Sequence, residues 1–221
     1  MTMITEGPRA GDYLLSESNG AQSRESAVIA AGADLVAGTV LGQLTKSVVA
    51  LTAAASGNTG ADTGLASVTV TLGAQALPGR YVLECTAAVV VDPATPAQWS
   101  ITAPNGLALQ SAASGVAYAG SHLNLTLGVG TTPWAAGDLL YVDVSGTGQY
   151  IQHNPDAVTG AEIAVAVLYE SVDAAEAIAD GVITARLAEV DDAALTWHTG
   201  ITDAEKAAAV ASLAARHIIV R

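Results

Sequence analysis

The chain has 221 residues, 51% of them apolar, with no Phe and a formal net charge of −13. A core of small and β-branched side chains favours sheets over helical bundles. With only eight Lys and Arg side chains, a nucleic-acid partner is not expected, because binding to phosphates depends on basic residues.

The composition also limits where the protein works. The N-terminal stretch MTMITEGPRAGDYLL contains charged residues and no apolar run, so it does not resemble a signal peptide. No stretch approaches the ~20 apolar residues of a membrane span. We therefore expect a chain made in a cytoplasm, without a membrane partner. Cys85 cannot form an internal disulfide, and we expect it to be a small buried hydrophobe.

The first residues of the chain predict a mobile arm followed by a strand. Residues 1–12 include Gly7, Pro8 and Gly11 and have no periodic apolar face. The next stretch, DYLLSES, has strand propensity but no hairpin partner nearby in the sequence. Such a segment can gain hydrogen bonds by adding to the sheet edge of another chain. A frayed terminus without consequence is the alternative.

The outer parts of the chain predict further strands. Residues 25–45 contain two short apolar stretches around Gly32 and Gly38. Residues 160–172 form a nearly all-apolar stretch, which is typical of a strand buried on both faces. Residues 180–190 predict a fourth strand.

The middle of the chain has a different composition. Residues 51–150 carry one basic and five acidic side chains, whereas the other 121 residues carry seven and sixteen. Stretches rich in Gly, Ser, Thr and Ala flank this region, as in linkers. We therefore expect an inserted domain at residues 56–146, between core segments 18–55 and 147–221.

The inserted region predicts an antiparallel β-sandwich. Residues 67–72, 78–87, 121–128 and 138–144 alternate apolar and polar side chains, and turn signals such as Asn105-Gly106 separate them. In 121–128, for example, Leu123, Leu125 and Leu127 share one face, and His122 shares the other with Asn124 and Thr126.

The C-terminal region predicts a capped helix and a final strand. Thr202 and Glu205 have the spacing of a capping box, and Asp203 adds favourable negative charge. The expected apolar stripe is Ala207, Val210, Leu213 and Ala214, with Arg216 in the last turn and a strand at HIIVR.

The sequence offers little catalytic or metal-binding chemistry. The four histidines, His122, His153, His198 and His217, are dispersed, and none has a second ligand at metal spacing. Trp197 before His198 is better explained by packing, and Asp191-Asp192 by a one-turn helix with an acidic start. No nucleophile, phosphate or calcium-loop motif occurs. We expect no cofactor, no metal and no enzyme, unless a scattered His and Asp meet in space.

Several stretches resemble the head decoration proteins of tailed phages, the group of the phage lambda decoration protein. The resemblance rests on GDYLLSE with SRE close behind, on LVAGTVLG, and on ALTWHTGITDAEKAAAVASLAARHIIVR. It covers residues 5–45 and 150–221. It implies a homotrimer that binds the major capsid protein on the outer surface of the expanded head, at threefold and quasi-threefold positions, and stabilises the shell against internal pressure. It implies no catalytic residues.

In this family the N-terminal arm becomes ordered on the capsid and pairs with strands of the major capsid protein. Carried over to this chain, the arm is residues 1–17. Its capsid-binding residues are Thr5, Glu6, Gly7, Pro8, Arg9, Ala10, Gly11, Asp12, Tyr13, Leu14, Leu15, Ser16 and Glu17.

The inserted region departs from the compact family members and resembles the immunoglobulin-like modules of virion proteins. The expected fold class is therefore mainly β with minor α (α+β). A β-rich decoration core is closed by a C-terminal helix and carries the inserted sandwich. A second hypothesis is a virion-surface binding module, whose inserted domain recognises host glycans through Trp99, Tyr118 or Trp134. Exposure of these rings discriminates between the two hypotheses.

Overall fold

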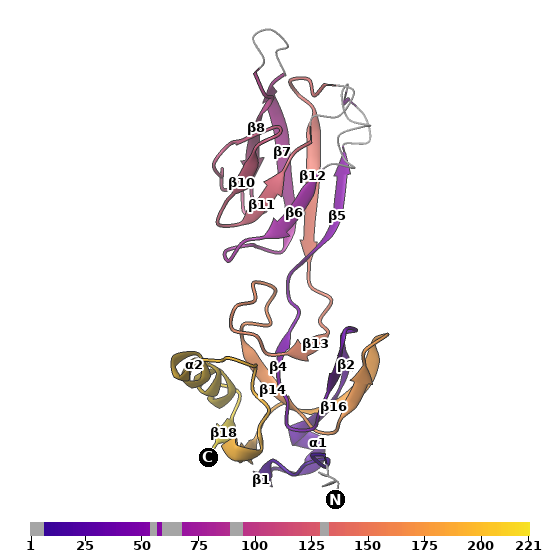
Figure 1. The fold of residues 1–221 in the computed structure, drawn as a ribbon, viewed down its shortest axis with the longest axis vertical. Coiled ribbons are helices and arrows are strands. Elements are labelled where there is room, and N and C mark those ends of the chain that lie inside the picture. Colours follow the sequence, from indigo (N-terminus) through magenta and orange to yellow (C-terminus); the bar gives the residue numbers. More distant parts are fainter. Residues whose placement is uncertain (1–6, 54–56, 59–67, 89–94, 129–132) are drawn as a thin grey trace, which may run out of the picture. The chain divides into compact units, whose positions relative to one another are not determined.

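A computed structural model describes residues 7–53, 57–58, 68–88, 95–128 and 133–221. The chain divides into two compact units. The core unit consists of the residues up to Thr45 together with Thr147–Arg221, and the inserted unit is Lys46–Gly146. The fold is mainly β with one long helix, as the composition predicts (Figure 1).

A closed barrel forms the centre of the core unit. Its strand order is β13-β2-β16-β14-β4. Closure leaves no unpaired edge within the barrel. The bounds are Arg24–Ile29 for β2, Val40–Gln43 for β4, Tyr150–Gln152 for β13, Ala164–Leu168 for β14 and Ala179–Thr184 for β16.

Smaller elements surround the barrel. A three-stranded sheet has the order β1-β17-β18, and a two-stranded sheet pairs β15 with β3. These elements are β1 (Leu14–Glu17), α1 (Gly20–Ser23), β3 (Ala33–Leu35), β15 (Val172–Ala174), β17 (Ala188–Val190) and β18 (Ile218–Val220).

The apolar stretch at 160–172 becomes β14, whose five residues are all buried, so the prediction of a strand covered on both faces is confirmed. The stretch at 180–190 was wrongly predicted as one strand. It forms β16 and β17, because Leu187 has a φ of 53° and turns the chain between them.

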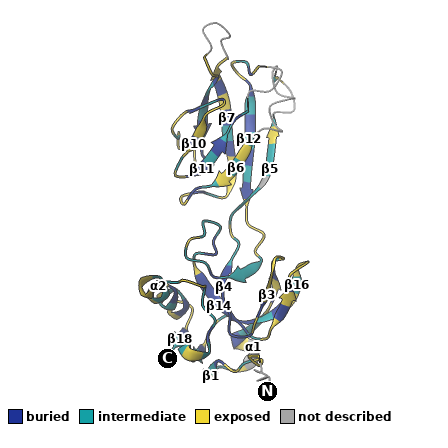
Figure 2. Cartoon of the chain, in the orientation of Figure 1, coloured by how far each residue is buried: buried dark blue, intermediate teal, exposed yellow. Residues whose placement is uncertain are grey.

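The helix α2 (Asp203–Ala214) begins as the sequence predicts. Thr202 and Glu205 form both hydrogen bonds of a capping box. Its buried face differs from the prediction, since Ala209 and Leu213 are buried whereas Ala207 and Ala214 are exposed. The helix also ends before Arg216. Figure 2 shows exposed residues, interspersed with intermediate ones, along α2.

The inserted unit consists of two antiparallel sheets. One has the order β5-β12-β7-β8-β9 and the other β10-β11-β6. The strands are β5 (Ser47–Ala53), β6 (Thr69–Leu72), β7 (Gly79–Ala87), β8 (Gln98–Thr102), β9 (Ala112–Ala113), β10 (Ala117–Ala119), β11 (Leu123–Thr126) and β12 (Leu139–Ser145).

The inner faces of both sheets enclose one hydrophobic cluster, which includes Tyr81, Trp99, Leu123 and Leu140. The predicted alternation of apolar and polar faces is present in these strands. His122 is an exception, because the sequence places it on the polar face. This side chain is buried and lies 3.1 Å from the Tyr81 hydroxyl.

The inserted unit begins at Lys46 rather than at residue 56, because β5 pairs with β12 along its length. Its first and last strands are therefore antiparallel neighbours, with Ser47 opposite Ser145. In the core unit, β4 and β13 are also antiparallel partners, with Gln43 opposite Tyr150. The inserted unit thus occupies the place of the turn in a β-hairpin.

A hydrogen bond ties the start of β7 to the residues just before it. The Leu77 N–H donates to the Tyr81 hydroxyl, four residues further on, at 2.7 Å. This tyrosine therefore binds the backbone just upstream of it. It fixes the loop that leads from β6 into β7.

Candidate functional site

The N-terminal segment of the described chain has an exposed part and an anchored part. Residues 7–10 are exposed. A tight turn follows, in which the Arg9 N–H donates to the Asp12 carboxylate at 2.9 Å and the Leu14 N–H donates to the Gly11 carbonyl at 2.9 Å. Thr5 and Glu6 lie outside the described residues. The predicted arm is therefore divided at this turn.

Gly11 joins the turn to the core unit. Its N–H donates to the Tyr169 carbonyl oxygen at 3.0 Å. Its φ is 76°, and a Cβ at this position would lie 3.0 Å from the Tyr169 ring. Both facts favour glycine. The direction in which residues 7–10 leave the core unit depends on this contact.

Tyr13 is part of the hydrophobic core and does not belong to a mobile arm. It is only 1% exposed, and its hydroxyl lies 2.6 Å from Thr184 Oγ1. Burial raises the pKa of Tyr13 to about 12. DYLLSES has no hairpin partner nearby in the sequence, as predicted, but from Leu14 onward it has a strand partner far away in its own chain.

The strand β1 pairs with β17 in antiparallel register. Leu14 lies opposite Val190, and Glu17 lies opposite Ala188. Sequence reasoning missed this pairing because the partners are far apart in the chain. Glu17 is held further by Arg24, whose Nε donates to it at 3.0 Å and whose guanidinium lies 3.9 Å from the Tyr169 ring centre.

The edge of this sheet carries an exposed apolar residue. The register of β1 shifts between Leu14 and Ser16, so Leu15 is the extra residue of a β-bulge. Leu15 is 56% exposed. β1 is the outer strand of its sheet, so one side of its backbone has no strand partner among the described residues. Leu187 is also exposed, and its carbonyl oxygen accepts a hydrogen bond from the Ser18 N–H.

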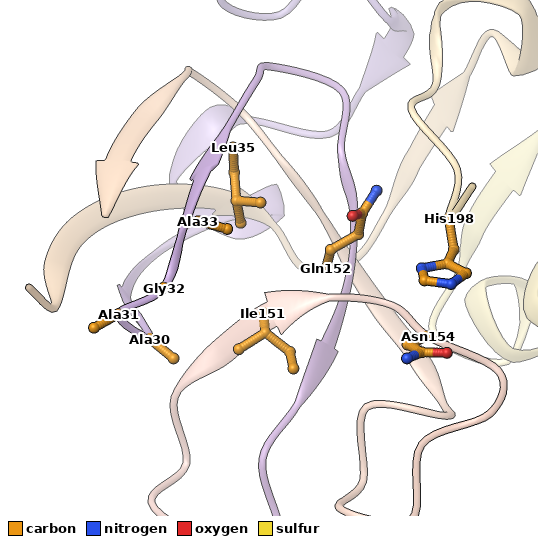
Figure 3. A pocket seen from close by; sticks show the side chains of 9 residues that line it. All are labelled: Ala30, Ala31, Gly32, Ala33, Leu35, Ile151, Gln152, Asn154 and His198. Atoms are coloured by element: carbon orange, nitrogen blue, oxygen red, sulfur yellow. The ribbon is translucent and has the colours of Figure 1, made fainter. Parts of the chain in front are cut away.

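The core unit has a pocket of 280 Å³ between the β2–β3 turn, β13 and the segment before α2. Figure 3 shows residues of the β2–β3 turn on one side and Asn154 and His198 on the other. The lining residues are Ala30, Ala31, Gly32, Ala33, Leu35, Ile151, Gln152, Asn154 and His198. His198 is the one titratable group of this lining, so the pocket contains no acid–base pair.

His153, next to this lining, is 2% exposed. Its Nε2 lies 3.3 Å from the Glu162 carbonyl oxygen, while its Nδ1 has no hydrogen-bond partner. Burial, and to a smaller degree the charge of His198, lowers the pKa of His153. This histidine is therefore neutral near pH 7, as expected of a packed side chain.

The other residues considered for chemistry have structural partners. Asp191 caps a 3₁₀ helix at Asp192–Ala194, so the prediction of a one-turn helix is confirmed. Asp192 binds Lys206 at 2.7 Å and the Trp197 Nε1 at 3.1 Å. Cys85 is buried, which raises the pKa of its thiol. Within the described ranges, no three His, Cys, Asp or Glu side chains are grouped to hold a metal.

The three aromatic residues considered for glycan binding are buried. Trp99 and Trp134 are 0% and 1% exposed, and their rings pack edge to face at 5.0 Å. Tyr118 is 8% exposed. Sugar sites need an exposed ring face for stacking, so these side chains do not form one. The alternation in the strand QWSIT could have predicted the burial of Trp99, because Trp99 shares one face of the strand with the apolar Ile101.

Neither a membrane helix nor a solved structure helps to assign a function to this chain. Among the helices of the described residues, none has the length and hydropathy needed to cross a membrane. No curated protein matches the chain. The crystal structure of Xanthomonas campestris FlgL is similar at 17% identity and a TM-score of 0.31, over 52% of this chain and 34% of that one. The chain thus spans about a third of that protein, and a likeness this weak identifies neither fold nor function.

The family comparison covers nearly the whole chain, including the inserted unit. The family model described as bacteriophage lambda head decoration protein D matches residues 3–218. The chain belongs to the phage lambda head decoration protein D family.

Proposed function

We propose that this protein is a cementing protein of a phage head. It binds as a homotrimer to the outer surface of the expanded capsid, at threefold and quasi-threefold positions, and stabilises the shell against the pressure of packaged DNA. Its partner is the major capsid protein. Family membership supports a capsid role, and the net charge of −13 fits a surface that does not bind DNA.

One observation carries the proposal at residue level, namely the combination of an anchored Tyr13 with exposed residues 7–10 and an outer strand β1. Tyr13 and Gly11 hold the segment at a fixed point of the core unit. Residues before Gly11 then extend to the capsid, and a capsid strand adds to the open side of β1. Main-chain hydrogen bonds of this kind give affinity without a deep pocket.

The cementing effect follows from repetition. Each trimer offers three such segments, so the binding of one raises the effective concentration of the others. Individual contacts of modest strength then give high occupancy, and the shell gains a link between neighbouring capsomers at every site. No step in this function breaks or forms a covalent bond, and we assign no enzymatic activity or cofactor.

The test compares the full chain with a truncation that removes residues 1–10. This cut leaves Gly11, Tyr13 and β1 in place, whereas removal of residues 1–17 would also delete core contacts. Purified, undecorated, expanded heads of the parent phage are mixed with each chain and sedimented. We expect saturable binding of the full chain and at least about tenfold weaker binding of the truncated one.

Matching thermal unfolding of the two chains is the control for an intact fold. Equal binding of both chains would refute the role of the segment before Gly11. Absence of binding by the full chain would refute the capsid function itself. The glycan-binding alternative receives no support from Trp99, Tyr118 or Trp134, since all three are buried.

A further inference from the structure

A long part of the inserted unit carries no charge. Between Asp92 and Asp138 the sequence contains no Asp, Glu, Lys or Arg, in a chain of net charge −13. His122 lies in this stretch but is buried against Tyr81. The described part of the stretch forms β8, β9, β10 and β11. The described residues of this stretch therefore add no formal charge to the surface of an acidic protein.

This surface is hollowed on both sides of β10. A groove of 250 Å³ lies over the sheet β10-β11-β6, and a second groove of 270 Å³ lies between β9 and β10. Both grooves include Ala117, Tyr118 and Ala119. The first is completed by Thr69, Thr71, Asn124, Leu125 and Thr126, and the second by Gln98, Gln110, Ser111, Ala112, Ala113 and Val116. We call these two groove linings the β10 face.

The residues of the β10 face are suited to burial against another protein. They are methyl, hydroxyl and amide side chains, whose desolvation costs less than that of charged groups. Val116 is a large apolar residue that is 53% exposed at the rim of the second groove. β10 is also the outer strand of its sheet. Exposed edges are usually protected by charge or proline, and this strand has neither.

We infer that the β10 face is a contact between two copies of this protein. The net charge opposes the approach of two copies, and the residues that line the β10 face carry no formal charge. The inference rests on the proposed function for one point. Decoration of a head places many copies at a high local concentration, so a weak contact is sufficient.

Cross-linking tests the contact directly. Cys85, the single cysteine, is buried, so a cysteine introduced by Val116→Cys is the reactive thiol. Leu107→Cys is the matched control, because Leu107 is 52% exposed in the same charge-free stretch but lines neither groove. On decorated heads treated with a short bismaleimide, we expect covalent dimers from Val116→Cys and few from Leu107→Cys. Equal yields, or a product with the major capsid protein, would overturn the inference.

Binding isotherms give an independent measurement. With Val116→Asp we expect the binding curve on heads to become less steep and half-saturation to move to about threefold to tenfold higher concentration. Leu107→Asp should behave as the unmodified chain. An unchanged curve for Val116→Asp would count against the contact.

Failure of the inference can be told apart from failure of the capsid function. If the unmodified chain did not bind heads at all, the proposed function would fail, and the contact would be measured in concentrated solution instead. Sedimentation of the full chain should then show self-association that Val116→Asp removes and Leu107→Asp keeps. Self-association that is absent, or equal in all three chains, would refute the β10 contact.

Discussion

The Tyr13 hydroxyl lies 2.6 Å from Thr184 Oγ1, although the two residues are separated by most of the chain. Tyr13 belongs to the N-terminal segment, and Thr184 ends the barrel strand β16. Both side chains are buried. The contact fixes the point at which the N-terminal segment leaves the core unit, and so links the stability of the fold to the placement of the residues that we propose to bind the capsid.

Replacing Tyr13 by Phe tests how much this hydrogen bond stabilises the fold. The ring remains, but the buried Thr184 hydroxyl loses its partner, so we expect the free energy of unfolding to fall by about 1–2 kcal/mol. Urea unfolding measures the change. Head binding by the folded variant should be nearly unaffected, since the backbone of β1 stays in place. Unchanged stability would mean that the hydrogen bond contributes nothing in water.

A charge at the edge of β1 should weaken head binding. Leu15 is exposed at the bulge of this outer strand, and charged side chains at an edge oppose the addition of another strand. For Leu15→Asp we expect a loss of affinity for expanded heads of about tenfold. Ile178→Asp is the matched control, because Ile178 has a similar exposure in the same unit. Equal losses in both variants would indicate a general effect of charge.

The sequence predicted local features well. The capping box of α2, the buried strand β14 and the alternation in β7 and β12 depend on neighbouring residues, and the structure contains them. The start of the inserted unit was misplaced because KSVVALTA runs into a stretch rich in Ala, Thr and Gly that resembles a linker. Its pairing with β12 depends on residues far away in the chain.

The candidate site shows the same division. The glycine at position 11 and the apolar residues of DYLLSES were visible in the sequence, but the strand partner of Leu14 is Val190. The inserted unit lies between Leu14 and Val190 in the sequence, and no pattern of residue spacing indicates that they pair. His122 was placed on the polar face by alternation, whereas its contact with Tyr81 buries it. Burial of a polar side chain depends on such a partner, which the pattern of one strand does not contain.

Acid should destabilise the core unit through His153. Burial lowers its pKa below the ordinary value of 6.5, so below that pH the unfolded chain binds a proton that the folded chain does not. Stability from this residue is therefore present above about pH 6.5 and is lost as the pH falls toward the folded pKa. Between about pH 7.5 and pH 5.5, the unmodified chain should lose more stability than His153→Gln.

The groups around His153 are the control for this measurement. His198, Glu162 and Glu205 contribute to its electrostatic environment. Urea unfolding of His198→Gln over the same pH range should keep most of the pH dependence, because burial is the largest cause of the lowered pKa of His153. If His153→Gln showed the same slope as the unmodified chain, the pH dependence would belong to other groups.

Removal of the inserted unit should leave a folded, head-binding core. The hairpin β4–β13 closes without it, since the Leu44 N–H donates to the Gln149 carbonyl at 2.8 Å and the Gly148 N–H donates to the Leu44 carbonyl at 3.0 Å. The hydrophobic cluster of the inserted unit is separate from the two clusters of the core unit. Replacing Lys46–Gly146 by Asn-Gly leaves a five-residue connection between the paired Leu44 and Gln149, a length that hairpins use. This change should alter the unfolding free energy of the core by less than about 1 kcal/mol. The shortened chain should still bind heads, because it keeps the N-terminal segment. Since it lacks the β10 face, its affinity should equal that of the Val116→Asp variant and its binding curve should not be steep. A core that unfolds on excision would show instead that the two units depend on each other for stability.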